Sequence, residues 1–149
     1  MKSLSSILVA IDFSDSSDKA FNTALFMAKK FSARLVLVHV INEPIDLRGF
    51  YVPHISFDKL EEEIKAGAEK MMEQFCRTHF EGFDNYESLI VPVIPYQEIL
   101  AVAQDKQVDM IVLGTHGRAG LDHVLFGSTA EKVVRKAPFP VLTIRLSED

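Results

Sequence analysis

Glycines and hydroxyl side chains placed between a buried strand and a helix start can bind phosphate, and this sequence has such a set. They follow an apolar run in the last third of the chain and comprise Gly114, Gly117, Gly127, Ser128 and Thr129. Because glycine has no side chain, backbone N–H groups can approach an anion closely, and a helix start adds unpaired donors. The pattern therefore indicates a phosphate site that needs no large positive charge, although Arg118 within the loop can add one.

Two familiar phosphate loops do not match this stretch. The P-loop requires a lysine directly before its serine or threonine, and Gly127 occupies that place. The dinucleotide-binding fingerprint has the spacing G-x-G-x-x-G after the first strand, whereas here G-x-x-G-x-x-G follows the fourth. A flexible strand-to-helix connection also contains glycines, so from the residues alone a phosphate site and a plain connection both stay open.

Alternating strands and helices must position this loop. Apolar runs typical of buried strands cover Ile7–Ile11, Arg34–Ile41, Ser88–Val93, Asp109–Leu113 and Val141–Arg145. The segments between them carry apolar residues at spacings of three and four, which is typical of amphipathic helices, and the last helix is expected from Ser128 to Ala137. This order predicts an α/β fold, with a mostly parallel sheet and helices on both faces.

Two connecting features add to this picture. Pro92 cannot donate a ladder hydrogen bond, so its strand is expected at an edge of the sheet. The connection from Glu43 to Ser56 is long and lacks periodicity, which is typical of a functional loop. Its Phe50-Tyr51-Val52 patch can contact a ligand or partner, or can pack on the domain itself.

Length and composition exclude several classes of function. The 149 residues are expected to form a single domain over positions 1–149. With 16 basic and 21 acidic residues the net charge is −5, which argues against nucleic-acid and anionic-membrane partners. No apolar run approaches the roughly 18 residues of a membrane span, no signal peptide is recognisable, and Cys76 alone forms no internal disulfide. We therefore expect a soluble cytoplasmic protein.

Three stretches spread over the chain match one known pattern. They are Ile7–Ser14, Asp109–Gly117 and Pro140–Ile144, and the spacing from Gly114 onward reads G-x2-G-x9-G-S. In this combination the sequence resembles the universal stress proteins, in the branch that binds ATP through this loop. The resemblance spans nearly the whole chain. It implies a Rossmann-like sheet of five parallel strands in the order 3-2-1-4-5, with the ligand at the point where that order reverses.

The resemblance also implies roles for single residues. Asp12 matches an acidic residue that accepts hydrogen bonds from ribose hydroxyls, the alternative being a helix cap or a loop stabiliser. Ala10 lies where members carry a small residue near the base, and Val40 matches an adenine-contacting position, with plain strand core as the alternative. The phosphate-contacting set would be Gly114, Gly117, Gly127, Ser128 and Thr129, on a loop that also holds Thr115, His116 and Arg118.

The function implied is that of an ATP-binding module of the stress response, acting in binding or signalling with an unknown protein partner. No histidine or cysteine spacing here matches a structural zinc site, but ATP can bring Mg²⁺ or Mn²⁺, because its phosphates supply most ligands of such a cation. No catalytic residue is assigned. Two alternatives stay open: a slow ATPase or phosphotransferase on the same scaffold, and a nucleotide-free dimeric interaction protein whose loop is only structural.

The closing strand and one departure complete the expectations. If Val141–Arg145 ends the sheet, it presents a free apolar edge, and the resemblance implies a homodimer in which this strand pairs with its twin. Family members often have glycine before the proline that opens the third helix, whereas this chain reads Val93-Ile94-Pro95. That difference is expected to change a strand end and to leave the phosphate loop intact.

Overall fold

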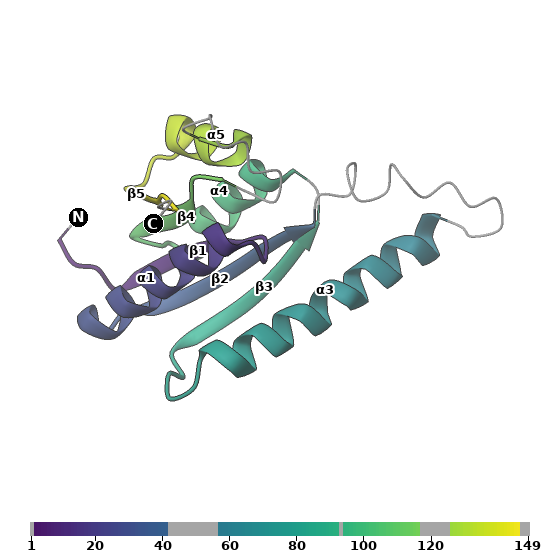
Figure 1. The fold of residues 1–149 in the computed structure, drawn as a ribbon. Helices are drawn as coiled ribbons and strands as arrows, with labels where there is room; N and C mark the ends of the chain where they lie inside the picture. Colours follow the sequence, from purple (N-terminus) through teal and green to yellow (C-terminus); the bar gives the residue numbers. More distant parts are fainter. Residues whose placement is uncertain (1, 42–56, 93, 117–125, 147–149) are drawn as a thin grey trace.

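Five parallel strands form one sheet in the order β3-β2-β1-β4-β5 (Figure 1). The computed structural model describes residues 2–41, 57–92, 94–116 and 126–146. This topology confirms the predicted Rossmann-like α/β fold and strand order. The strands are β1 (Ser6–Ile11), β2 (Arg34–Ile41), β3 (Tyr86–Pro92), β4 (Met110–Gly114) and β5 (Val141–Ile144).

Within the described ranges, four helices cover the two faces of the sheet. One apolar layer joins the sheet to α1 and α3, and the other joins it to α4 and α5. In the first layer Phe21 and Phe75 pack edge to face, and in the second Ile99 and Val133 are buried. No helix within the described ranges is long and apolar enough to cross a membrane. The helices are α1 (Asp15–Phe31), α3 (Phe57–His79), α4 (Pro95–Asp105) and α5 (Ser128–Lys136).

The second strand has the predicted bounds, and the boundaries of the other strands differ from the predicted ones by at most two residues. The third strand begins at Tyr86 and is described to Pro92, at one edge of the sheet as expected. The last strand ends at Ile144, so Arg145 of the predicted edge lies beyond it, and α5 ends at Lys136. The Glu43–Ser56 connection, with its proposed partner-facing patch, lies outside the described residues.

A polar cluster ties the amino ends of β1 and β4 together. Asp109 precedes β4, and its Oδ2 accepts hydrogen bonds from the Ser5 N–H at 2.9 Å, the Ser5 hydroxyl at 2.9 Å and the Ser6 N–H at 3.0 Å. These bonds, that of the Ser5 N–H first among them, hold the pKa of Asp109 below its usual range. The cluster stabilises the folded chain as long as the carboxyl group is ionised.

Replacing Asp109 by asparagine should lower the free energy of unfolding at pH 7 by about 1 kcal/mol, because charge-assisted bonds to two N–H groups weaken. A carboxyl group whose pKa is lower in the folded than in the unfolded state stabilises the fold fully at pH values above the unfolded pKa of about 3.9. This stabilisation is lost as the pH falls further. The gap between wild type and Asp109→Asn should therefore narrow below about pH 4.

Urea unfolding at a series of pH values measures this gap. The exposed Asp105→Asn, at the end of α4, is the matched control and should not lower stability, because a negative charge at the end of a helix is unfavourable. Equal loss in both variants would contradict a specific role for the Asp109 carboxylate.

Candidate functional site

The carboxyl ends of β1 and β4 lie side by side in the middle of the sheet. The two strands pair in parallel from Ile7 with Met110 to Val9 with Val112. After β1 the chain turns to one face of the sheet to form α1, and the helix that follows β4, α5, packs on the other face (Figure 1). The strand order therefore reverses between β1 and β4, and open α/β sheets bind ligands in the crevice at such a point.

Asp12 lies on the rim of this crevice, in the tight turn between β1 and α1. Its Oδ1 accepts the Ser14 N–H at 3.0 Å, and its own N–H donates to Ser17 Oγ at 3.2 Å. Ser14 is the N-cap of α1 and accepts the Ser17 N–H at 3.3 Å. The Asp12 carboxylate thus stabilises the loop, which is the alternative to ribose binding given for this residue. Since a carboxylate offers about four acceptor positions, this bond does not exhaust its capacity for a sugar hydroxyl.

Phe13 and His39 pack against each other at this turn. Phe13 has a left-handed backbone with φ of 64°, an uncommon conformation for a bulky residue. Its ring lies 4.6 Å from the imidazole of buried His39, whose Nδ1 is 2.9 Å from the carbonyl oxygen of Ile11. Sequence reasoning did not single out Phe13, because a positive φ at a phenylalanine has no local signal.

Gly114 lies where the end of β4 meets the first turn of α1. A Cβ on Gly114 would overlap with Ser16 Oγ and would lie 3.0 Å from the Ser16 carbonyl oxygen. The Ser16 hydroxyl is buried and has no hydrogen-bond partner in the described part of the chain. Close packing of α1 against β4 therefore requires glycine at this position, whatever ligand the crevice takes.

A backbone bridge links the end of β4 to the start of α5. Buried Thr115 donates its N–H to the Ile144 carbonyl at 3.0 Å, and its own carbonyl accepts the Gly127 N–H at 2.5 Å. Thr115 Oγ1 lies 3.0 Å from His116 Nδ1. These contacts fix where α5 begins, although ten residues separate its N-cap from His116 in the sequence.

The start of α5 presents backbone donors to the crevice. Gly127 is the N-cap, with φ of −71° and ψ of 167°, and no side chain caps the helix. In the described structure, the N–H groups of Ser128, Thr129 and Ala130 have no acceptor, as is usual for the first turn of a helix. The N–H of Gly127 is already bound to Thr115, so the donors available for an anion are those one to three residues further along.

Ala10 and Val40 share the face of the sheet that α4 and α5 cover. Both are half-buried near the carboxyl ends of their strands and pack against the second apolar layer. In register, Ala10 lies beside Val38, two residues before Val40. The two side chains therefore belong to the core layer, near the carboxyl ends of neighbouring strands. Gly117 and Arg118, the other two predicted site residues, lie outside the described residues.

The charges around the crevice are unequal. The start of α1 carries Asp12, Asp15 and Asp18, whereas the first turn of α5 holds Glu131, which pairs with Arg135 at 2.6 Å. Burial raises the pKa of Asp18, an effect that His79 opposes and that Asp15 and Asp12 increase. An anion is therefore more favourable at the start of α5 than at the start of α1.

The model of the universal stress protein family matches residues 4–145. The chain belongs to this family. Among its members, the universal stress protein YxiE of Bacillus subtilis is 35% identical over 144 residues, which cover 93% of this chain and 97% of that protein. Universal stress protein MJ0577 of Methanocaldococcus jannaschii is 29% identical over 151 residues, with 93% of each chain covered. A solved structure of MJ0577 covers 98% of this chain and 99% of its own, with a TM-score of 0.80.

Two further solved structures are complexes with a nucleotide. A universal stress protein in complex with cAMP has a TM-score of 0.63 and covers 98% of this chain and 100% of its own. The universal stress protein of Archaeoglobus fulgidus in complex with dAMP has a TM-score of 0.57 and covers 97% and 99%. Each is 20% identical to this chain, so the likeness extends to the fold.

Proposed function

We propose that this universal stress protein binds ATP in the crevice between the ends of β1 and β4. The observation that carries the proposal is the start of α5, where three N–H groups have no acceptor in the described part of the chain and which a backbone bond ties to the end of β4, at the strand-order reversal. Phosphates bind well at such helix starts because the donors and the helix dipole act together. The spacing G-x2-G-x9-G-S supports ATP among the adenine nucleotides.

The charges of the crevice favour one orientation of the nucleotide. The phosphates would lie at the start of α5, assisted by the hydroxyls of Ser128 and Thr129 and by the loop with Gly117 and Arg118. The ribose would lie beside Asp12, which can accept hydroxyl donors and would repel phosphate. Ala10 and Val40 would border the adenine. The cAMP and dAMP complexes of other family members support an adenine nucleotide in this fold.

A divalent cation enters this proposal through the nucleotide. In the described ranges no three histidine, cysteine or carboxylate side chains are grouped so as to hold a metal ion. Mg²⁺ or Mn²⁺ would therefore take most of its ligands from the phosphates and water. The protein would act as a stress-response binding or signalling module in the cytoplasm, with nucleotide occupancy altering a surface that a partner recognises.

The first test of the proposal is to measure the nucleotide content of the freshly purified protein. Heat release and chromatography should recover an adenine nucleotide, and calorimetric titration with ATP and Mg²⁺ should give a dissociation constant in the micromolar range, about −8 kcal/mol. GTP with Mg²⁺ is the matched control ligand. No bound nucleotide, together with no heat from ATP, ADP or AMP, would contradict the proposal.

We further propose a homodimer through the outer edge of β5, beside which no other described strand lies. Because Ile111 N–H bonds to the Pro140 carbonyl and Thr115 N–H to that of Ile144, Leu142 and Ile144 point their backbone groups toward β4. Val141 and Thr143 then point theirs away from the sheet, as alternation along a strand requires. A second β5 can pair with these groups.

Thr143→Pro should convert the dimer to a monomer, because it removes an outward N–H without breaking the β4–β5 ladder. Thr143→Ala keeps that N–H and is the control. Size-exclusion chromatography with light scattering at micromolar concentration measures the mass. A wild-type monomer, or a Thr143→Pro dimer, would contradict pairing through this edge.

A further inference from the structure

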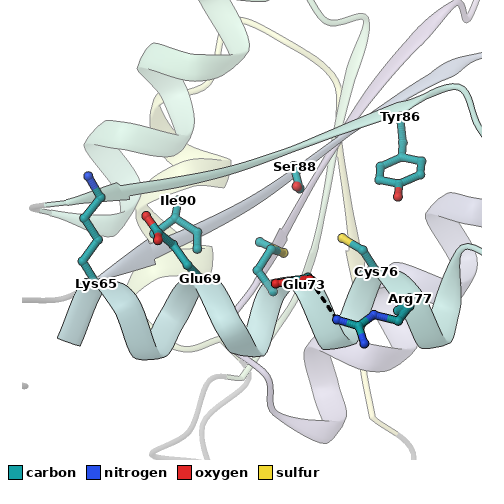
Figure 2. A pocket seen from close by; sticks show the side chains of 9 residues that line it. Lys65, Glu69, Glu73, Cys76, Arg77, Tyr86, Ser88 and Ile90 are labelled. Carbon is teal, nitrogen blue, oxygen red and sulfur yellow. Dashed lines mark hydrogen bonds and ion pairs between the residues drawn. The ribbon is translucent and has the colours of Figure 1, made fainter. Parts of the chain in front are cut away.

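A groove separates α3 from the opposite edge of the sheet, far from the nucleotide crevice. It has a volume of about 610 Å³ and lies between α3 and β3 (Figure 2). Its floor is apolar, with Met72 and Cys76 buried, and burial raises the pKa of the Cys76 thiol, which therefore stays protonated. The groove is lined by Lys65, Glu69, Met72, Glu73, Cys76, Arg77, Tyr86, Ser88 and Ile90.

The β3 edge beside this groove has unpaired backbone groups. Leu35 N–H bonds to the Asn85 carbonyl, and Leu35 is in register with Tyr86. In a parallel pair, every second residue of a strand directs its backbone N–H and C=O groups toward the partner strand. In β3 these are Glu87 and the odd-numbered residues after it, which bond to β2. The N–H and C=O groups of Ser88 and Ile90 therefore point outward, where no strand among the described residues follows. Such an edge pairs readily with another extended chain.

The rim of the groove carries charges of both signs. Along α3, Glu73 pairs with Arg77 at 2.9 Å, whereas Lys65 and Glu69, one turn apart, form no ion pair within 4.0 Å in the described part of the chain. Figure 2 shows Glu69 beside Ile90, with Lys65 beyond it at the end of the groove. A basic side chain brought along the β3 edge would meet Glu69 there.

The small side chain at the centre of the edge opens space for an apolar group. Ser88 is exposed, and Figure 2 shows it facing Cys76 across the groove. Tyr86 and Ile90 flank it on the same face of the strand. A strand added next to β3 would place every second side chain on this face, so one of them would enter the groove beside Ser88.

We propose that the β3 edge and this groove bind an extended peptide segment of a partner protein, which adds a strand, inserts an apolar side chain beside Ser88 and places a basic side chain next to Glu69. Main-chain hydrogen bonds would provide the affinity, and the two side chains the specificity, as in other cases of strand addition. This binding is independent of the nucleotide crevice.

A second copy of the chain fits this edge poorly. α3 runs alongside β3 at the outer edge of the sheet (Figure 1). Two β3 strands paired edge to edge would be about 4.8 Å apart, whereas packed helices need about 8–10 Å between their axes. A peptide that has no helix of its own on that face avoids the clash.

Selection from a phage-displayed library of ten-residue linear peptides tests the proposal. Selected peptides should alternate, with an apolar residue two positions from a lysine or arginine. Ser88→Pro should weaken their binding at least about tenfold, because it removes an outward N–H, whereas Ser88→Ala should change it less than about twofold. Glu69→Lys should weaken binding about fivefold, and Glu62→Lys, on the same helix outside the groove, should not change it.

Hydrogen exchange on the wild-type chain gives a second readout that needs no variant to fold. Bound peptide should slow exchange at the amides of Ser88 and Ile90 by at least about tenfold, because both become hydrogen-bonded. Three results would overturn the proposal: no enrichment over an unrelated protein, selected peptides that leave these two amides unaffected, or a dimer that Ser88→Pro dissociates while Thr143→Pro does not.

Discussion

Gly114→Ala should lower the free energy of unfolding by about 2–3 kcal/mol, which corresponds to a fall of roughly 4–12 °C in melting temperature. The new methyl group would overlap with Ser16 Oγ and press on the Ser16 carbonyl oxygen at 3.0 Å. The carbonyl belongs to the backbone of α1 and cannot rotate away, so α1 must move from the end of β4. Because Asp12 lies in the turn before α1, ATP binding should weaken as well.

Two companion variants separate this cause from a general effect of alanine. Gly67 lies in α3 with open space around it, so Gly67→Ala should stabilise the chain by about 0.5–1 kcal/mol through helix propensity. Ser16→Ala removes a buried hydroxyl that has no described partner and should have little effect alone. Combined with Gly114→Ala it should restore part of the lost stability, because the carbonyl contact remains.

Thermal and urea unfolding of wild type and the four variants measure these differences. A Gly114→Ala protein as stable as wild type would show that α1 and β4 do not approach as closely as described. A double variant no more stable than Gly114→Ala would show that the whole loss of stability comes from the contact with the Ser16 carbonyl.

The fold could be predicted because its strongest signals are local. β1 and β2 are almost entirely buried and read as continuous apolar runs, and Pro92 indicates an edge by removing a donor. The strand ends could not be placed as well, because long-range contacts set them. Glu87 looks like a loop residue, yet it extends β3 by pairing with Arg34 at 3.5 Å and Lys106 at 3.2 Å.

The candidate site shows the same division between local and tertiary information. The spacing of glycines and hydroxyls indicated a helix start after β4, and α5 begins at Ser128 as predicted. Which N–H groups are available could not be read from the spacing, because the Gly127 N–H binds Thr115, twelve residues earlier. The need for glycine at position 114 likewise depends on Ser16, a residue of another element that no sequence pattern links to it.

Ser128→Pro should reduce ATP affinity about 10–100-fold while leaving the fold intact. Ser128 is the first residue of α5, where proline is favoured because its N–H has no intrahelical acceptor. Gly127 already has ψ of 167°, the extended conformation that a residue before proline adopts. The substitution therefore removes the N–H and the hydroxyl of Ser128 from the proposed phosphate site. The free energy of unfolding should change by less than about 0.5 kcal/mol.

Ser128→Ala separates the two groups, since it removes the hydroxyl and keeps the backbone N–H. If the helix start binds the phosphates, the proline variant should bind ATP at least about threefold more weakly than the alanine variant, by the loss of one charge-assisted bond. Calorimetric titration of both variants, with circular dichroism to verify α5, measures this ratio. Equal ATP affinity in folded Ser128→Pro and in wild type would show that the phosphates do not bind at the start of α5. The first turn of α5 would then be only a structural connection.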